Sequence, residues 1–114
     1  MHWIHLTDEE QLKNIVNKSQ ERSQVIFKHS TRCSISSLAL QRLQKAKQPE
    51  DVDFYFLDLI AHRSLSKKVA DTFKVEHESP QILLIRNGDC IYDESHTGIS
   101  MNGITDQALT AWNV

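Results

Sequence analysis

Cys33 is the residue best placed to do chemistry. It follows an apolar run (residues 25–28) and a short polar loop, and it precedes a segment in which apolar residues recur at helical spacing. This order predicts a thiol at a helix N-terminus, on the C-terminal edge of a strand, where unpaired backbone amides and the helix dipole stabilise a thiolate. The thiolate is the nucleophile of thiol–disulfide exchange. Because Ser36 stands three residues later, where a dithiol site would have its second cysteine, a redox site here would work with one thiol.

The polar residues around Cys33 could activate its sulfur or bind a ligand. The guanidinium of Arg32 could stabilise the thiolate or pair with a carboxylate, although a solvated loop arginine is an equally good interpretation. We expect the backbone amides of the first helical turn to donate to the sulfur and the Ser36 hydroxyl to reach it. The candidates for these roles are Thr31, Arg32, Ser34, Ile35 and Ser36.

Two histidines are candidates for a secondary role. His29 and His96 could donate protons or hold the carboxylates of a ligand, and the alternative for each is a structural or surface histidine. His29 and Cys33 are of metal-ligating types, but no second paired cluster completes four ligands. We therefore predict no metal site.

The second cysteine, Cys90, stands between a turn signal and a strand signal, where a free cysteine usually packs as a small apolar residue. We expect no structural disulfide between Cys33 and Cys90 in a reducing cytosol.

Composition limits the kind of protein. The chain has 114 residues, which is enough for one domain (1–114) with a hydrophobic core and too few for two. Its formal net charge is −2, so bulk charge does not indicate a nucleic-acid partner. No apolar stretch approaches the length of a membrane-spanning helix, and the N-terminus lacks the pattern of a secretory signal. We expect a cytoplasmic protein with no membrane or nucleic-acid partner.

Periodicity and turn signals predict nine elements. Strands are expected at 3–5, 25–28, 54–59, 82–85 and 90–93, with helices after Thr7, Cys33, Ser64 and at Thr105. Thr7 and Glu10 form a capping-box pattern, and Asn87-Gly88 is a hairpin signal. The residues expected on the buried helix faces are Leu12, Ile15, Val16, Ile35, Leu38, Ala39, Leu43, Ala46, Leu65, Val69, Ala70, Phe73, Ala108, Leu109 and Trp112.

The order β-α-β-α-β-α-β-β-α predicts an α/β protein. Strands that alternate with helices pair in parallel, and strands that are apolar on both faces require helices on both sides of the sheet. The closing hairpin makes the central sheet mixed.

This order resembles the thioredoxin fold. Cys33 opens the helix after the second strand, and Ser79-Pro80 stands just before the hairpin strand. In thioredoxin-like proteins that proline is cis and faces the active cysteine, so the preceding backbone can pair with an incoming peptide-like thiol. The resemblance implies that Ser79 and Pro80 bind ligand through the backbone. The alternative is a turn that only opens the strand.

A closer resemblance rests on the segment 31–36. Thr-Arg-Cys-Ser-Ile-Ser resembles the Thr-Arg-Cys-Pro-Ile-Ser signature of the YtxJ-type monothiol bacilliredoxins, and the match covers essentially the whole chain. The further matching residues are Lys28, His29, Ser30, Leu57, Asp58, Arg63, Ser66, Val75, His77, Ser79, Pro80, Gln81, Ser95, His96 and Ile99.

The resemblance implies removal of bacillithiol from mixed disulfides on client proteins. Bacillithiol, a cysteinyl-glucosaminyl-malate thiol, would be the co-substrate, with no tightly bound cofactor. The Cys33 thiolate would attack the bacillithiol sulfur, and a second bacillithiol would release the enzyme as bacillithiol disulfide. One alternative is a monothiol glutaredoxin-like protein that bridges an iron–sulfur cluster through Cys33, although the glycine of its Cys-Gly-Phe-Ser motif is missing. The other is a non-catalytic, redox-sensing interaction module.

Three positions depart from a known pattern. Ser34 replaces the usual proline after the cysteine, which restores an N–H and adds a hydroxyl near the sulfur, so we expect altered thiolate reactivity. Thr97 replaces the tryptophan expected after Ser95-His96. Phe27 stands where thioredoxins have a buried aspartate that serves the resolving thiol, which agrees with the missing second cysteine.

Overall fold

Five strands, four α-helices and a short 3-10 helix make up the computed structural model, which describes the backbone of residues 1–112 and the side chains of residues 1–110. The order is the predicted β-α-β-α-β-α-β-β-α, with the 3-10 helix η1 before the last α-helix. None of the helices in this described part of the chain is long and apolar enough to cross a membrane. The bounds are β1 Trp3–His5, α1 Glu9–Lys18, β2 Ser23–His29, α2 Ser34–Lys45, β3 Val52–Asp58, α3 Arg63–Phe73, β4 Gln81–Arg86, β5 Asp89–Ser95, η1 His96–Gly98 and α4 Met101–Trp112.

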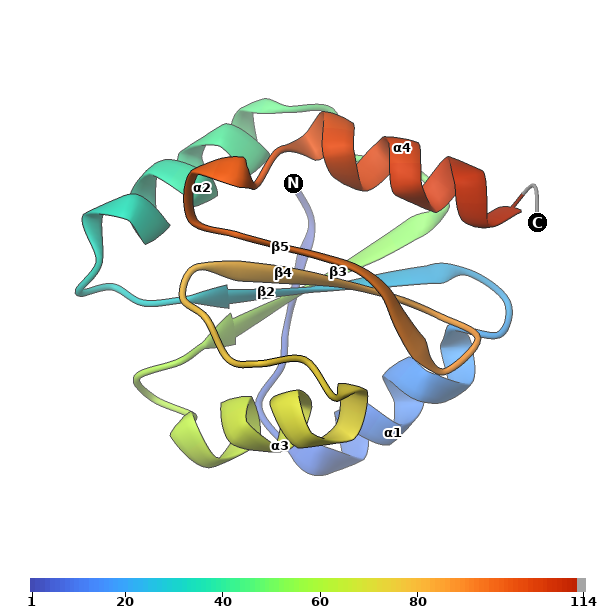
Figure 1. The fold of residues 1–114 in the computed structure, drawn as a ribbon, viewed down its shortest axis with the longest axis horizontal. Helices are drawn as coiled ribbons and strands as arrows, with labels where there is room; N and C mark the ends of the chain where they lie inside the picture. Colours follow the sequence, from blue (N-terminus) through green and yellow to red (C-terminus); the bar gives the residue numbers. More distant parts are fainter. Residues whose placement is uncertain (113–114) are drawn as a thin grey trace.

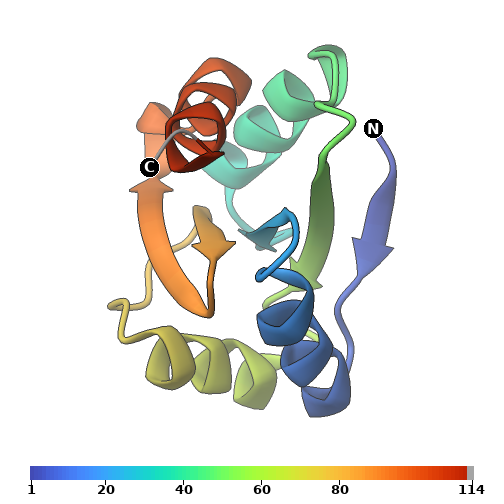
Figure 2. The same cartoon turned by 90° about the vertical axis from the view of Figure 1, so that its right-hand side faces the viewer.

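The strands form one mixed sheet in the order β1-β3-β2-β4-β5. The first three strands are parallel, β4 runs antiparallel to β2, and β5 runs antiparallel to β4. Helices α2 and α4 cover one face of the sheet, and α1 and α3 cover the other (Figures 1 and 2). The α/β fold with a doubly covered mixed sheet is confirmed.

Burial on both faces explains why β2 is hidden along its whole length. Its side chains alternate between two apolar cores, because successive residues of a strand point to opposite faces. Val25 and Phe27 pack in the core under α2 and α4. Ile26 packs in the core over α1 and α3.

The hairpin turn agrees with its sequence signal. Asn87 and Gly88 have φ values of 54° and 79°, as a two-residue hairpin of the primed type requires. The turn leads into β5, where Cys90 pairs with Ile85.

The predicted start of α1 is wrong by one residue. Asp8, not Thr7, is the N-cap, and it forms a capping box with Gln11 instead of Glu10. Both positions carry good capping residues, so local pattern does not distinguish them. Asp8 is favoured as the N-cap because the amide of the Gln11 side chain also donates to the His5 carbonyl and so links α1 to β1.

The starts of the last two helices were also predicted too late. His62, not Ser64, is the N-cap of α3, because Asp58 first organises a turn by accepting from the amides of Ile60 and Ala61. Helix α4 begins at Met101, not Thr105. There the Ser100 hydroxyl accepts from the Gly103 amide in the first turn.

Three side chains are not on the faces predicted for them. Ile35 and Leu38 are 40% and 53% exposed, because Ser36, Ala39 and Leu43 form the buried face of α2. Residues one position earlier are rotated by about 100° around the helix. Leu109 is also exposed. The predicted burial of Trp112 falls outside the described side chains.

Candidate active site

Three segments meet at one edge of the sheet. Strands β2 and β3 are parallel and end side by side at His29 and Asp58, so α2 and α3 both begin at this edge. Strand β4 runs in the opposite direction and begins here, with Gln81 paired to Lys28. The register therefore brings the Cys33 loop, the start of α3 and the Ser79-Pro80 turn together.

Cys33 is the N-cap of α2, as predicted. Its backbone is extended (φ −113°, ψ 118°), and its side chain makes no capping hydrogen bond. The thiol is partly exposed, and the first turn of α2 carries no acidic residue. A thiolate at this position can therefore accept from first-turn amides and benefit from the helix dipole.

Ser36 is buried and turned to partners other than the sulfur. Its Oγ lies 2.7 Å from His29 Nδ1 and accepts from the Ser30 amide at 3.0 Å. Among the described residues it has no hydrogen bond to Cys33. The expectation that this hydroxyl reaches the sulfur is therefore not met, and its bonds instead pin the end of β2 to α2.

His29 belongs to this buried link. The side chain is 5% exposed and packs against the rings of Phe27 and Phe56. Burial lowers the pKa of His29, although the Asp58 carboxylate and the contact with Ser36 oppose the shift. A neutral, enclosed imidazole fits the structural interpretation of this histidine better than a proton donor to solvent.

The remaining loop residues are exposed. Ser34 is the first residue of α2, and Thr31, Arg32, Ser34 and Ile35 all lie at the surface. The Arg32 amide donates to Ser30 Oγ at 3.3 Å, which shapes the turn before Cys33.

The bond between Ser79 and Pro80 is cis, as the resemblance implied. Pro80 is buried, and its carbonyl accepts from the His96 amide at 3.0 Å. The Ser79 hydroxyl is buried without a hydrogen-bond partner among the described residues.

His96 sits on the outer side of this turn. Its Nε2 lies 3.4 Å from a Glu78 carboxylate oxygen, and both side chains are about half exposed. Next to it, exposed Thr97 contributes only its carbonyl, which accepts from Arg42 Nη1 at 3.2 Å. His96 is thus tied to the cis-proline turn, and no contact with Cys33 is recorded within the described chain.

Cys90 lies at the opposite end of the sheet. Its partner Ile85 is four residues from Gln81, which is about 13 Å along the strand at roughly 3.3 Å per residue. Burial raises the pKa of the Cys90 thiol to about 11, and its Sγ contacts the Tyr92 carbonyl at 3.4 Å. Cys90 is a protonated packing residue that is too distant to resolve a disulfide at Cys33.

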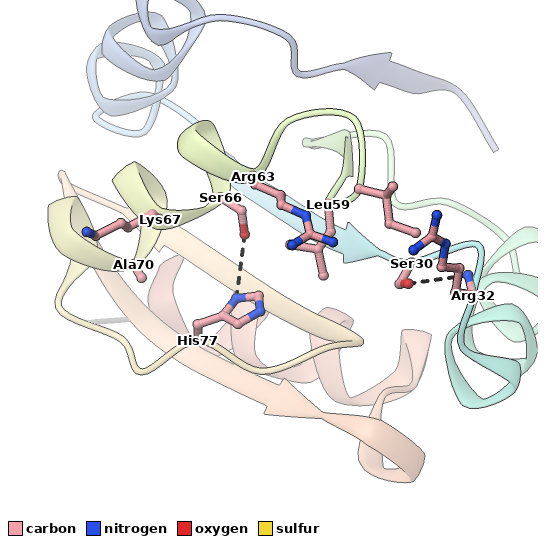
Figure 3. Close-up of a pocket in the computed structure, with 9 residues that line it drawn as sticks. Ser30, Arg32, Leu59, Arg63, Ser66, Lys67, Ala70 and His77 are labelled. Carbon is pink, nitrogen blue, oxygen red and sulfur yellow. Dashed lines mark hydrogen bonds between the residues drawn. The ribbon is translucent and has the colours of Figure 1, made fainter.

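A cleft of about 470 Å³ opens between α3 and the Cys33 loop (Figure 3). Sequence reasoning did not predict it. The only signal was that Arg63, Ser66 and His77 belong to the family pattern, without an assigned role. The residues that line the cleft are Ser30, Arg32, Leu59, Ile60, Arg63, Ser66, Lys67, Ala70 and His77.

A buried lysine stands behind the cleft. Lys28 is fully buried on the α3 side of β2, and its Nζ lies 3.2 Å from Nδ1 of His77. Burial lowers the pKa of Lys28 to about 8. Burial and the neighbouring Lys28 also lower the pKa of His77. In the part of the chain that the structure describes, no three His, Cys, Asp or Glu side chains are grouped as a metal site.

Proteins of known structure share this architecture. A chain described as a candidate oxidoreductase with a thioredoxin fold is 28% identical, with a TM-score of 0.81 over 92% of each chain. Mitochondrial thioredoxin 3 of Saccharomyces cerevisiae is 24% identical, with a TM-score of 0.70 over 90% of this chain and 92% of its own. Malassezia sympodialis thioredoxin is 16% identical, with a TM-score of 0.72 over 95% of this chain and 91% of its own.

The fold, the N-cap thiol and the cis-proline turn define a thioredoxin-fold oxidoreductase. The model of the monothiol bacilliredoxin BrxC family matches residues 4–104. The chain therefore belongs to the monothiol bacilliredoxin family.

Proposed function

We propose that this protein removes bacillithiol from mixed disulfides on client proteins through the Cys33 thiolate. The observation that carries the proposal is the position of Cys33 as the N-cap of α2, with no second thiol within reach. A single activated thiol can exchange disulfides only if a small thiol completes the cycle. Membership of the bacilliredoxin family supports bacillithiol as that thiol.

The cycle balances without another oxidant. The Cys33 thiolate attacks the bacillithiol sulfur of the client mixed disulfide, the client leaves as a thiolate that takes up a proton, and Cys33 keeps the bacillithiol. The thiolate of a second bacillithiol then attacks that sulfur, releasing the Cys33 thiolate and bacillithiol disulfide. The client is reduced to its thiol, and one bacillithiol thiol is consumed as its sulfur joins the bacillithiol sulfur of the mixed disulfide to form bacillithiol disulfide.

Each step has residues suited to it. The first-turn amides of α2 stabilise the leaving and attacking thiolate of Cys33. The backbone before the cis bond at Pro80 pairs with the incoming peptide-like thiol. The exposed apolar side chains of Ile35 and Leu38, on the first turns of α2, provide a contact surface for protein clients. The cycle requires a reducing compartment, so we place the protein in the cytoplasm.

Intact mass spectrometry tests this function. The wild-type protein, Cys33→Ser and Cys90→Ser are each mixed with bacillithiol disulfide. We expect a single adduct on wild type and on Cys90→Ser, and none on Cys33→Ser, because Cys33 lies at a helix N-terminus whereas burial raises the pKa of the Cys90 thiol to about 11. Equal modification of both variants would refute the assignment.

Two further outcomes point to other functions. Visible absorbance in anaerobically purified protein, lost in Cys33→Ser, would favour an iron–sulfur cluster protein. A Cys33 that reacts no faster than a free cysteine would favour a non-catalytic module.

A further inference from the structure

The cleft beside the Cys33 loop carries cationic groups and no acidic residue. Arg32, Arg63 and Lys67 line it, and no Asp or Glu does. The guanidinium groups of Arg63 and Arg32 reach into the same space from α3 and from the Cys33 loop (Figure 3). Among the described residues, the recorded ion pairs involve none of these three side chains. Like charges converging without a carboxylate between them favour an anionic ligand.

The wall of the cleft adds buried positive charge. The Lys28 ammonium lies behind His77, with 3.2 Å between Nζ and Nδ1. An ammonium can only donate, so His77 Nδ1 accepts and the proton of the neutral ring sits on Nε2. Ser66 is the other polar group of this wall, with its Oγ 3.5 Å from the same Nδ1. A buried ammonium without a carboxylate partner is costly, and an anion in the adjoining cleft would offset that cost.

The N-termini of helices α2 and α3 also favour an anion in this cleft. Neither α2 nor α3 has an acidic residue in its first turn, and α3 begins with Arg63. Helix α1 begins at the same edge, because β1 is parallel to β3, and it has the usual acidic start with Glu9 and Glu10. The first turns of α2 and α3, the two helices that border the cleft, therefore carry no carboxylate of their own.

We propose that this cleft binds the carboxylates of the small thiol that exchanges at Cys33, which for bacillithiol means its malate group, with Arg63 and Arg32 as the charged ligands. This inference rests on the proposed function. Arg32 adjoins Cys33 in the chain, so the cleft begins next to the reacting sulfur. Guanidinium groups suit bidentate pairing with carboxylates, and about 470 Å³ lies within the usual range for small-molecule sites.

The test compares two disulfides that differ only in the malate. Second-order rates of adduct formation on Cys33 are measured by quenched intact mass, with bacillithiol disulfide and with the disulfide of cysteinyl-glucosamine. The variants are Arg63→Gln, Arg63→Lys and the control Lys68→Gln, which removes a charge from exposed α3 surface outside this cleft. Both positions tested, Arg63 and Lys68, are exposed, so the fold is expected to survive the substitutions.

We expect Arg63→Gln to slow the reaction with bacillithiol disulfide about tenfold, since one charge-assisted hydrogen bond is lost. The same variant should react with the malate-free disulfide at the wild-type rate, as should Lys68→Gln with both. Arg63→Lys should recover part of the loss.

The outcomes separate the two proposals. If wild type reacts with neither disulfide, the proposed function fails, and this inference fails with it. If wild type reacts with both at equal rates, or Arg63→Gln slows both equally or neither, the malate subsite is refuted while the function stands.

Discussion

At the scale of single residues, the position of the missing second thiol is occupied by a structural hydroxyl. Ser36 holds His29 and the Ser30 amide together beneath the Cys33 loop. Ser36 is also the third residue of α2, the position that the side chain of an N-cap residue can reach. The loop geometry is therefore compatible with a dithiol site, and the side chain at position 36 decides that the site is monothiol.

Ser36→Cys should convert Cys33 to one half of an intramolecular disulfide. Oxidation followed by thiol alkylation and intact mass would detect the bond. The variant should also lose about 1–3 kcal/mol of unfolding free energy in its reduced form, because the Ser30 amide and His29 lose a buried partner. Ser34→Cys is the matched control, since adjacent residues are only ~3.8 Å apart between Cα atoms, closer than an unstrained disulfide allows. If oxidised Ser36→Cys carries only mixed disulfides and no bond between Cys33 and the new cysteine, this geometry is contradicted.

At the scale of elements, the start of α2 is compatible with the proline that the family carries. Ser34 is the first helical residue, where proline is favoured, and Cys33 is extended, as the residue before a proline must be. The departure at Ser34 is thus not forced by the backbone. The amides of Ile35 and Ser36, which an N-cap side chain reaches, are unchanged by it.

Ser34→Pro should raise the unfolding free energy by about 0.4–1 kcal/mol by restricting the unfolded chain. It should slow iodoacetamide alkylation of Cys33 by less than about threefold, since one amide near the sulfur is removed and two remain. Urea unfolding and alkylation kinetics measure both effects. Ser37→Pro is the control, and it should be strongly destabilising because the Ser37 amide donates to the Cys33 carbonyl at 3.1 Å. Destabilisation by Ser34→Pro would mean that α2 begins elsewhere.

At the scale of the whole molecule, the site is assembled from segments that are far apart in the chain. The Cys33 loop, α3 and the turn at Pro80 meet because β2 and β3 are parallel and β4 is antiparallel to β2. Lys28 and His77 join two of these segments across 49 positions of sequence. The burial of Lys28 makes the stability of the fold depend on pH.

Lys28→Met should stabilise the protein at pH 7 by up to about 3 kcal/mol. The pKa of Lys28 is lowered to about 8 in the folded state from 10.5, so the unfolded chain binds more protons between these values. The cost of the buried ammonium is complete below pH 8 and is relieved as the pH rises toward 10.5. Urea unfolding from pH 7 to pH 10 should show that the difference in unfolding free energy between Lys28→Met and wild type becomes smaller. The exposed control Lys68→Met should have the same unfolding free energy as wild type across this range. A difference for Lys28→Met that stays constant with pH would contradict the lowered pKa of Lys28.

The order of elements and the helical spacing after Cys33 predicted the start of α2. Local capping patterns misplaced the starts of α1, α3 and α4. These helices begin directly after Asp8, His62 and Ser100 because of tertiary contacts and turns that a capping pattern in the sequence does not contain. The exposed position of Ile35 was missed because a one-residue rotation of α2 is decided by packing on the sheet.

The sequence by itself determined the order of elements, the family and the single thiol at a helix start, because these follow from periodicity, turn residues and the motif around Cys33. Only the tertiary structure decided the partners of Ser36, the remoteness of Cys90 and the cleft with Arg32 and Arg63. The physical reason is that strand pairing brings together side chains tens of residues apart. Their charges and hydrogen bonds then depend on which neighbours the sheet provides.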